Sequence, residues 1–292
     1  MRTVEYVAPR TLDEAVSALA QAGMTGRVLS GGTDIIIQAR EGRKDVSVFV
    51  DVKKIPDVMT VSNGADGGLT IGASVPCAEL YENADIARRY PALIDSASLI
   101  GGIQIQSRAS LGGNLCNASP AADSIPTLIV LGATCLIAGP QGRRELPVEE
   151  FCTGPGANAL EAGEMLVALQ LPAPAANSGA AFERFIPRNE MDIAVCNAAA
   201  SVTLSKDGSS FEAARVAVGA VAPTPLLVKE AADALTGKGV GEAAIAAAAE
   251  AAGNAARPIT DMRGSVAQRK HLAGVLTRRV IERAIERARS AK

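Results

Sequence analysis

Two short glycine-rich segments contain the residue types that bind anionic ligands. Residues 28–35 place Gly31-Gly32 beside serine, threonine and aspartate, and residues 110–114 place Gly112-Gly113 between Ser110 and Asn114. Adjacent glycines let the backbone approach a ligand closely and let consecutive N–H groups converge on one anion, such as a diphosphate. Two such segments in one chain predict a pocket for a long phosphorylated cofactor.

Neither segment follows the familiar nucleotide-binding loops. No Gly-Lys-Ser/Thr follows Gly32, so the first segment is not a Walker loop, and it lacks the GxGxxG of a Rossmann turn. A Gly-Gly-Thr-Asp tetrapeptide alone is more often an ordinary turn. The second segment favours a binding site, because Ser110 and Asn114 can bond phosphate or sugar oxygens. Two roles are open for Asp123. Its carboxylate either caps a helix that starts at Ser124 or accepts a hydrogen bond from a cofactor hydroxyl.

Composition limits the possible partners. The chain has 292 residues, enough for two or three packed units. Its 29 basic and 31 acidic residues form no basic stripe, which gives no support for binding nucleic acid or an anionic membrane. The most apolar stretch, residues 127–138, is shorter than the roughly 20 residues of a membrane span. Residues 1–6 have no apolar signal core. We therefore expect a cytoplasmic protein without a membrane span.

The cysteines and the single histidine offer no chemistry of their own. The five cysteines are Cys77, Cys116, Cys135, Cys152 and Cys196, and none forms a CxxC pair. Because iron–sulfur clusters and structural zinc need closely spaced thiolates, we expect buried reduced thiols and no metal in this chain. His271 falls on the apolar stripe of a predicted last helix, where we expect packing or capping. No acid–base pair stands out, so we predict no catalytic residue.

Local patterns predict the elements that position the two segments. Thr11 and Glu14 form a capping box for a helix that Gly23 ends. The expected strands are 27–30, 46–52, 68–73, 134–138, 165–171, 180–185, 193–204 and 214–221; the expected helical segments are 77–99 (interrupted at Pro91), 124–131, 241–256 and 265–288. The pattern predicts an α+β protein.

A Pro- and Ala-rich linker, residues 172–179, divides the predicted elements. We expect one domain over residues 1–175, itself split into lobes of about 1–55 and 56–175. A smaller α+β domain, an antiparallel sheet with helices, is expected over residues 180–288. Each lobe carries one glycine segment, and a pocket between lobes is a common place for a cofactor.

These residues together resemble the FAD-binding medium subunit of the molybdenum hydroxylases, the family of xanthine dehydrogenase, aldehyde oxidoreductase and carbon monoxide dehydrogenase. The likeness extends from near residue 5 to residue 285. It is carried by residues 31–34, 104–105, 109–114, 118–123, Arg188 with 192–194, 218–225, 261–263, 271–273 and 278–279. One departure is Gln-Ile-Gln-Ser at residues 104–107, where the family commonly has Gln-Ile-Arg-Asn; this puts a local contact in doubt more than the cofactor.

The resemblance implies a two-lobed PCMH-type FAD-binding domain followed by a C-terminal domain of the CO-dehydrogenase flavoprotein type. The two segments would wrap the diphosphate, Ile100 and Leu166 would lie against the cofactor, and Asp123 would hold a cofactor hydroxyl. Arg184 would lie near the pyrimidine end of the flavin and stabilise its anionic reduced form, or else be an exposed strand residue. The implied FAD-binding residues are Val28, Leu29, Ser30, Gly31, Gly32, Thr33, Asp34, Ile35, Ile100, Ser110, Gly112, Gly113, Asn114, Asp123, Leu166 and Arg184.

The resemblance also implies an electron-transfer role. A large partner with molybdopterin would hydroxylate the substrate, and a small partner would carry electrons through 2Fe–2S clusters to FAD. The flavin would pass them to NAD, a quinone or dioxygen, in a heterotrimer or a dimer of heterotrimers. Thr33-Asp34 and residues 121–123 favour an N-heterocycle or aldehyde substrate over carbon monoxide. The alternatives are a carbon monoxide dehydrogenase medium subunit, a stand-alone flavin oxidoreductase and a regulatory module that binds an adenine nucleotide.

Overall fold

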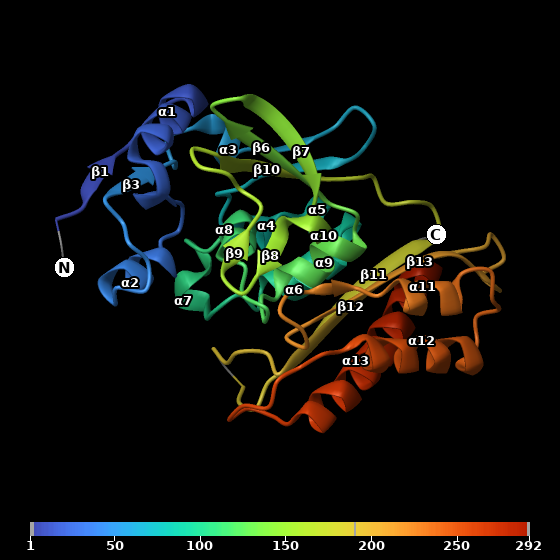
Figure 1. Ribbon diagram of the computed structural model, residues 1–292. Helices are drawn as coiled ribbons and strands as arrows, with labels where there is room; N and C mark the ends of the chain where they lie inside the picture. Colours follow the sequence, from blue (N-terminus) through green and yellow to red (C-terminus); the bar gives the residue numbers. More distant parts are fainter. Residues whose placement is uncertain (1–2, 190, 291–292) are drawn as a thin grey trace.

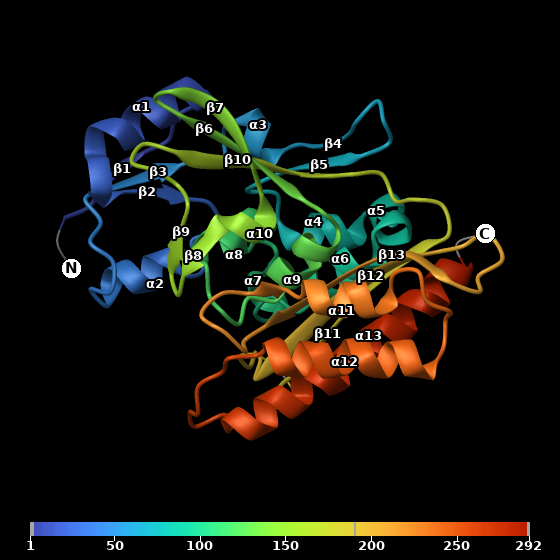
Figure 2. The ribbon, with the colours of Figure 1, turned by 45° about the vertical axis from the view of Figure 1, so that its right-hand side comes forward.

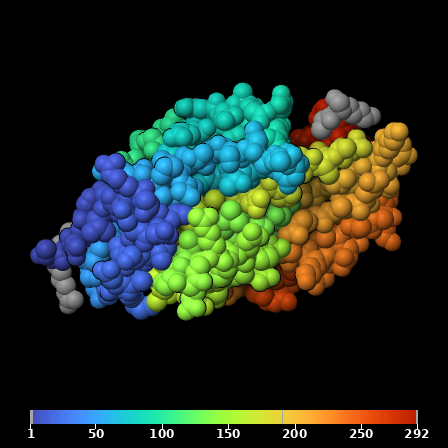
Figure 3. Space-filling model, turned by 90° about the horizontal axis from the view of Figure 1, so that it is seen from above, coloured from blue at the N-terminus to red at the C-terminus, as the bar shows by residue number. Residues whose placement is uncertain are grey.

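The computed structural model describes residues 3–189 and 191–290. We call residues 3–55 the small lobe, 56–175 the large lobe and 178–290 the C-terminal domain. In the space-filling view of Figure 3, the small lobe and the C-terminal domain lie at opposite ends of an elongated molecule, with the large lobe between them. Within the described residues, no helix combines the length and apolarity that a bilayer crossing requires.

The small lobe is a parallel sheet covered by one helix. Its strands are β1 (Glu5–Val7), β2 (Gly26–Leu29) and β3 (Val48–Asp51), in the order β1-β3-β2. The predicted capping box of α1 (Leu12–Ala22) is confirmed: Thr11 Oγ1 accepts from the Glu14 amide at 3.2 Å, and the Glu14 carboxylate accepts from the Arg10 amide at 2.7 Å. Gly23 ends this helix with a φ of 56°, and η1 (Gly23–Thr25) leads into β2. The first glycine segment leads from β2 into α2 (Ile35–Arg40).

The large lobe combines an antiparallel sheet with short helices, as Figure 1 shows. The sheet order is β4-β5-β10-β6-β7, with β4 (Val61–Asn63), β5 (Leu69–Gly72), β6 (Thr134–Gly139), β7 (Gly142–Pro147) and β10 (Met165–Leu171). The helices are α3 (Pro56–Met59), α4 (Cys77–Glu82), α5 (Ala84–Arg89), α6 (Pro91–Ala97), α7 (Ile103–Gln106), α8 (Leu111–Asn117), α9 (Ser124–Val130) and α10 (Val148–Phe151). The hairpin of β8 (Cys152–Gly154) and β9 (Ala157–Asn158) completes the lobe. The segment predicted as one interrupted helix over 77–99 forms three helices. Asn83 caps the start of α5, and Pro91 starts α6.

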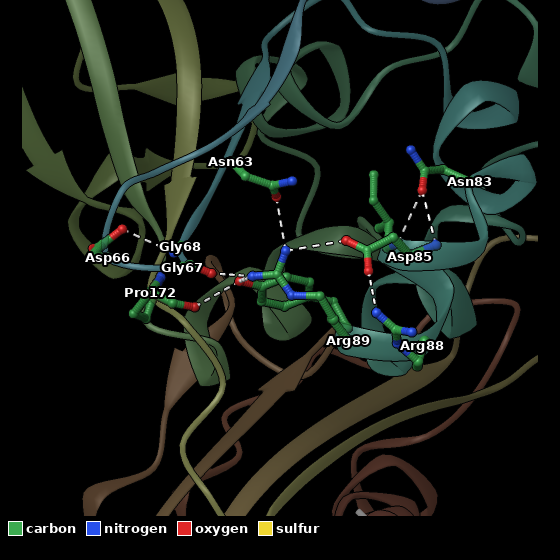
Figure 4. Close-up of polar contacts among 11 residues, drawn as sticks. Asn63, Asp66, Gly67, Gly68, Asn83, Asp85, Arg88, Arg89 and Pro172 are labelled. Atoms are coloured by element: carbon green, nitrogen blue, oxygen red, sulfur yellow. Dashed lines mark hydrogen bonds and ion pairs between the residues drawn. The ribbon is translucent and has the colours of Figure 1, made fainter.

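Arg89 holds the β4–β5 hairpin against α5 (Figure 4). Its guanidinium donates to Asn63 Oδ1 at 2.8 Å, to Asp85 Oδ2 at 3.3 Å and to the Gly67 carbonyl. It also lies 5.2 Å from the ring centroid of Tyr90, a cation–π distance. The Tyr90 hydroxyl donates to the Pro172 carbonyl at 2.9 Å, so the same cluster fixes the chain where it leaves the large lobe.

The C-terminal domain is an antiparallel sheet buried on both faces. Its strands, in sheet order, are β11 (Ser178–Phe185), β12 (Cys196–Leu204), β13 (Phe211–Gly219) and β14 (Leu226–Leu227). Its own helices α11 (Lys229–Leu235), α12 (Glu242–Ala255) and α13 (Val266–Ser290) cover one face (Figure 2). The other face packs on α6 and α9, since Phe182, Ala199 and Ala217 belong to the apolar core of the large lobe. The predicted two-domain α+β architecture with an antiparallel C-terminal sheet is confirmed.

Candidate functional site

A cavity of about 360 Å³ lies between the lobes, where the two glycine segments meet. This volume is within the range of small-molecule sites. The predicted residues that line it are Val28, Ser30, Gly31, Gly32, Thr33, Asp34, Ile35, Ile100, Ser110, Gly112, Gly113, Asn114 and Leu166. Leu29, Asp123 and Arg184 are not among the lining residues. Leu29 is the last residue of β2, and its neighbours Val28 and Ser30 supply the lining there.

Sequence analysis missed one wall of the cavity. Residues 160–164, the connection into β10, line it together with Met24 and Arg27 of the small lobe and Asn158 of β9. None of these residues lies in a glycine-rich segment, and tertiary folding alone brings them to the cavity. The nearest sequence signal was the predicted strand 165–171, which these residues precede.

The first segment has the backbone geometry of an anion cradle. Gly32 adopts a φ of +76°, which strains any residue with a side chain. A Cβ on Gly31 would lie 2.0 Å from the Arg108 carbonyl oxygen, so only glycine lets this segment rest against the large lobe. Among the described residues, the amides of residues 31–35 find no protein acceptor. Five consecutive N–H donors are therefore available at the cavity wall.

The second segment forms the first turn of α8. Ser110 caps this helix: its Oγ accepts from the Gly113 amide at 3.1 Å, and its carbonyl accepts from the Asn114 amide at 2.9 Å. A Cβ on Gly112 would lie 2.4 Å from the Ala73 carbonyl oxygen, so this glycine permits close packing. Asn114 Oδ1 accepts from Ser124 Oγ at 2.6 Å, which leaves its Nδ2 as a donor at the cavity.

The lobes touch at the cavity through a few polar contacts. Ser30 Oγ lies 3.2 Å from Ser110 Oγ, joining the two glycine segments directly. Gln38 Nε2 of α2 donates to Asn117 Oδ1 of α8 at 2.9 Å, and Lys44 Nζ donates to a carbonyl of the β8–β9 turn at 3.3 Å. These contacts hold the segments at a fixed separation without filling the space between them.

The charges around the cavity are mixed. Burial raises the pKa of Asp34, while the charge of Arg43 and the Thr33 hydroxyl partly oppose the rise. The hydrogen bond from Arg144 lowers the pKa of Glu164, and the two side chains form an ion pair at 2.7 Å. Asp34 therefore takes up a proton more readily than an exposed aspartate, which reduces its repulsion of an anionic ligand.

Asp123 and Arg184 form a buried ion pair across the large lobe and the C-terminal domain. Arg184 Nη1 donates to Asp123 Oδ2 at 2.7 Å and to the Leu99 carbonyl at 3.0 Å, and the two side chains are 8% and 11% exposed. The interpretation of Arg184 as an exposed strand residue is wrong. Asp123 precedes α9, but its carboxylate makes no capping bond, because Arg184 binds it instead.

The second carboxylate oxygen of Asp123, Oδ1, is in a different situation. Asp123 Oδ1 is buried and has no hydrogen-bond partner among the described residues. Burial raises the pKa of Asp123 to about 6, although the positive charge of Arg184 opposes the rise. The carboxyl therefore offers a buried acceptor, and a buried acceptor without a donor is costly.

The cysteines and His271 lie apart from any acid–base arrangement. All five cysteines are free; Cys77, Cys135 and Cys196 are buried, and Cys116 and Cys152 are half-buried. Burial raises the pKa of Cys116, which lines the cavity, to about 12, so its thiol is protonated and unreactive at neutral pH. His271 is exposed on α13, so the expectation that it packs is wrong. Arg188 and Asp192 form an ion pair at 3.1 Å.

Comparison with known proteins covers the chain almost from end to end. Residues 2–174 match the family model "FAD binding domain in molybdopterin dehydrogenase", and residues 181–284 match "CO dehydrogenase flavoprotein C-terminal domain". The chain is 32% identical to the xanthine dehydrogenase FAD-binding subunit of Escherichia coli O157:H7 over 97% of its own length and 96% of that protein. It is 31% identical to the carbon monoxide dehydrogenase medium chain of Afipia carboxidovorans, over 98% of both.

Solved structures give the same result. Quinoline 2-oxidoreductase from Pseudomonas putida 86 matches with a TM-score of 0.90 and 31% identity, over 98% of both chains. Carbon monoxide dehydrogenase from Hydrogenophaga pseudoflava matches with a TM-score of 0.93 and 30% identity, over 97% of this chain and 98% of that one.

Proposed function

The chain belongs to the FAD-binding subunits of the molybdenum hydroxylases, which are oxidoreductases, and from this premise we propose that it carries electrons from iron–sulfur clusters of a partner subunit to an external acceptor. FAD, held in the cavity between the lobes, supplies the redox chemistry. The observation that carries the proposal is the meeting of two glycine segments, from different lobes, at one cavity.

The donors at the cavity fit a diphosphate. The amides of residues 31–35 supply N–H groups from one side, and the Gly112 N–H and the Asn114 Nδ2 supply donors from the other. Such a cradle binds phosphate oxygens through backbone N–H groups. Ile100 and Leu166, 7% and 5% exposed, offer apolar surface to the ring systems.

We propose that Asp123 and Arg184 also act on the cofactor, although neither residue lines the cavity. The unpartnered Oδ1 of Asp123 is the acceptor for a cofactor hydroxyl, and Arg184 fixes the orientation of the carboxylate through Oδ2. Arg184 then affects the flavin through its charge and through Asp123. Arg184→Lys keeps the charge, so its flavin should have a midpoint potential closer to the wild-type value than that of Arg184→Met.

The substrate and the acceptor depend on the partners. We propose a small iron–sulfur subunit and a large molybdopterin subunit, in a heterotrimer or a dimer of heterotrimers; this agrees with relatives named as subunits or medium chains. An N-heterocycle or aldehyde substrate is supported by Thr33-Asp34 and residues 121–123. The similarity to quinoline 2-oxidoreductase agrees with that substrate class. A carbon monoxide dehydrogenase remains the second candidate, because its medium chain is as similar in sequence.

The test is electron flow through the purified protein. The FAD-loaded chain is mixed with its co-purified partners and substrate without oxygen, and the flavin absorbance is followed. We expect bleaching that requires the partners, then recovery when NAD, a quinone or dioxygen is added. A chain that refuses FAD, or that oxidises a substrate without partners, contradicts the proposal.

A further inference from the structure

A lysine that does not line the cavity binds the backbone of the first glycine segment. Lys53 Nζ donates to the Ser30 carbonyl oxygen at 3.1 Å and to Asp51 Oδ1 at 2.7 Å. The Lys53 amide also donates to Asp51 Oδ1, at 3.0 Å, and the Tyr6 hydroxyl donates to Asp51 Oδ2 at 2.6 Å. Asp51, at the end of β3, thus anchors the ammonium group that binds the glycine segment.

This network is partly shielded from water. The side chains of Lys53 and Asp51 are 31% and 11% exposed. Burial opposes ionisation of Asp51, but the hydrogen bonds from Lys53 and Tyr6 outweigh it and lower the pKa of the carboxyl. The Asp51 carboxyl is therefore ionised at neutral pH. Because Asp51 offsets much of the charge of Lys53, the effect of this lysine on its surroundings is chiefly to hold one carbonyl in place.

Holding the Ser30 carbonyl orients the next amide. In a trans peptide the C=O and the following N–H point in opposite directions, so a donor at the Ser30 oxygen turns the Gly31 N–H the other way. Gly31 lines the cavity, and its amide has no acceptor among the described residues. Glycine at position 31 leaves this peptide more freedom to rotate than a residue with a side chain would. A charged donor on the carbonyl also polarises the amide and strengthens its N–H as a donor.

We propose that Lys53, held by Asp51 and Tyr6, is a positioning residue that presents the Gly31 N–H to the diphosphate of the cofactor. The inference rests on the proposed FAD site. Lys53 is not among the residues that line the cavity, so it acts through the Ser30–Gly31 peptide and not by contact.

The experiment compares two neighbouring lysines. Lys53→Met removes the hydrogen bond to Ser30, whereas Lys54→Met removes the same charge from an exposed side chain next to it. Dissociation constants for FAD and ADP are measured on the FAD-free chain by flavin fluorescence and calorimetry. We expect Lys53→Met to weaken both ligands by the same factor, about tenfold, which corresponds to one charge-assisted hydrogen bond. Lys54→Met should bind like the wild type.

Two further measurements separate positioning from a general structural defect. Lys53→Arg, which keeps a charged donor, should recover most of the affinity, and Tyr6→Phe should weaken both ligands by about threefold, as partial loss of the anchor on Asp51 predicts. The urea midpoint of the FAD-free protein should fall somewhat in Lys53→Met, because among the described residues Asp51 keeps only the Tyr6 hydroxyl and the backbone amide of residue 53 as donors. The affinities are therefore compared without urea, where circular dichroism should show every variant folded. If Lys53→Met lowered the affinity for FAD much more than the affinity for ADP, the substitution would have distorted the cavity, and the positioning role would be overturned.

The outcomes also separate this inference from the proposed function. A wild-type chain that binds FAD and ADP, with Lys53→Met binding equally well, overturns the positioning role and leaves the FAD site standing. A wild-type chain that binds neither ligand overturns the FAD site and the role together.

Discussion

The large lobe meets its two neighbours through interfaces of different chemistry. The interface with the C-terminal domain, which we call the C-terminal interface, is apolar and ionic, and three ion pairs between described residues cross it. They are Arg184–Asp123 at 2.7 Å, Arg287–Asp95 at 2.6 Å and Arg215–Glu149 at 2.7 Å. Each of these arginines also donates to a backbone carbonyl at the interface. Among the buried side-chain polar atoms of the described residues at this interface, Asp123 Oδ1, Thr127 Oγ1 and Asn197 Oδ1 have no partner.

The interface with the small lobe, which we call the lobe interface, is incomplete at the cavity. Three hydrogen bonds between uncharged groups or to a carbonyl span it there, and the amides of residues 31–35 have no acceptor among the described residues. Away from the cavity, the small lobe packs on Ala138, Met165 and Val167 of the large-lobe sheet. The difference indicates that the chain itself closes the C-terminal interface, whereas a ligand completes the lobe interface.

Breaking the C-terminal interface should have the largest effect. Arg184→Met leaves the Asp123 carboxylate buried without a counter-charge, and we expect a loss of about 3–5 kcal/mol in the free energy of unfolding at pH 7. Urea unfolding of the FAD-free protein measures it. The control is Arg88→Met, since Arg88 is 77% exposed and pairs with Asp85 on the surface; it should cost less than about 1 kcal/mol. Equal losses would mean that burial of the pair is unimportant.

The pH dependence of the same pair should be the next largest effect. Because the pKa of Asp123 is raised to about 6 in the folded chain, the folded state binds the proton more tightly than the unfolded state. Stability from this group is therefore greatest below about pH 4, falls as the pH rises to about 6, and is constant above that. The shift corresponds to about 3 kcal/mol. Asp123→Asn cannot titrate, so the stability of wild type minus variant should fall over this range in urea titrations. A difference independent of pH would show that Asp123 is ionised throughout.

Asp123 also shows what sequence reasoning could not reach. The Thr11–Glu14 box was predictable, because both residues act on a helix that begins beside them. The capping role of Asp123 was equally local, but an arginine 61 residues away in the chain takes its carboxylate. Local patterns identify the residues with binding capacity; long-range packing decides which partner each one meets.

The same reasoning applies to the cavity. The glycine segments were visible in the sequence because adjacent glycines have conformational freedom that other residues lack, and polar residues flank them on both sides. The wall at residues 160–164 and the contact of Gln38 with Asn117 were not, because they depend on how two lobes dock. The helix α2 and the hairpin of β8 and β9 were missed for another reason: a six-residue helix and strands of three and two residues carry too little periodicity.

Adding FAD should sharpen the contrast between the interfaces. At a free FAD concentration 100 times the dissociation constant, binding should stabilise the folded state by about 2.7 kcal/mol. Hydrogen exchange should slow at the amides of residues 31–35, which gain acceptors, and should remain unchanged in β12, whose amides are already paired. Exchange by mass spectrometry with and without FAD checks this. Equal protection of both regions would show that the ligand acts on the whole chain.

A side chain at Gly31 should open the lobe interface. The Cβ of Gly31→Ala would lie 2.0 Å from the Arg108 carbonyl oxygen, so backbone must move, and we expect a loss of about 2 kcal/mol in stability together with weaker FAD binding. Gly154→Ala is the control, since its Cβ would have no neighbour nearer than 3.9 Å. Urea unfolding and FAD titration are measured on both variants. A stable Gly31→Ala that binds FAD normally would show that the lobes separate at no cost.

Removing one contact across the lobe interface should have the smallest effect on stability and a visible effect on ligand exchange. Gln38→Ala deletes the hydrogen bond to Asn117, which joins α2 to α8 at the cavity, and we expect a loss of about 0.5–1 kcal/mol. Because this bond must break if the lobes part to release FAD, the dissociation rate, measured by flavin fluorescence after dilution, should rise about threefold. Gln21→Ala removes a similar bond, to Ser17 at 3.1 Å, but within α1, and should leave that rate unchanged. If both variants release FAD at the same rate, the lobes do not separate during release, and the cofactor leaves through the cavity mouth with the lobe interface closed.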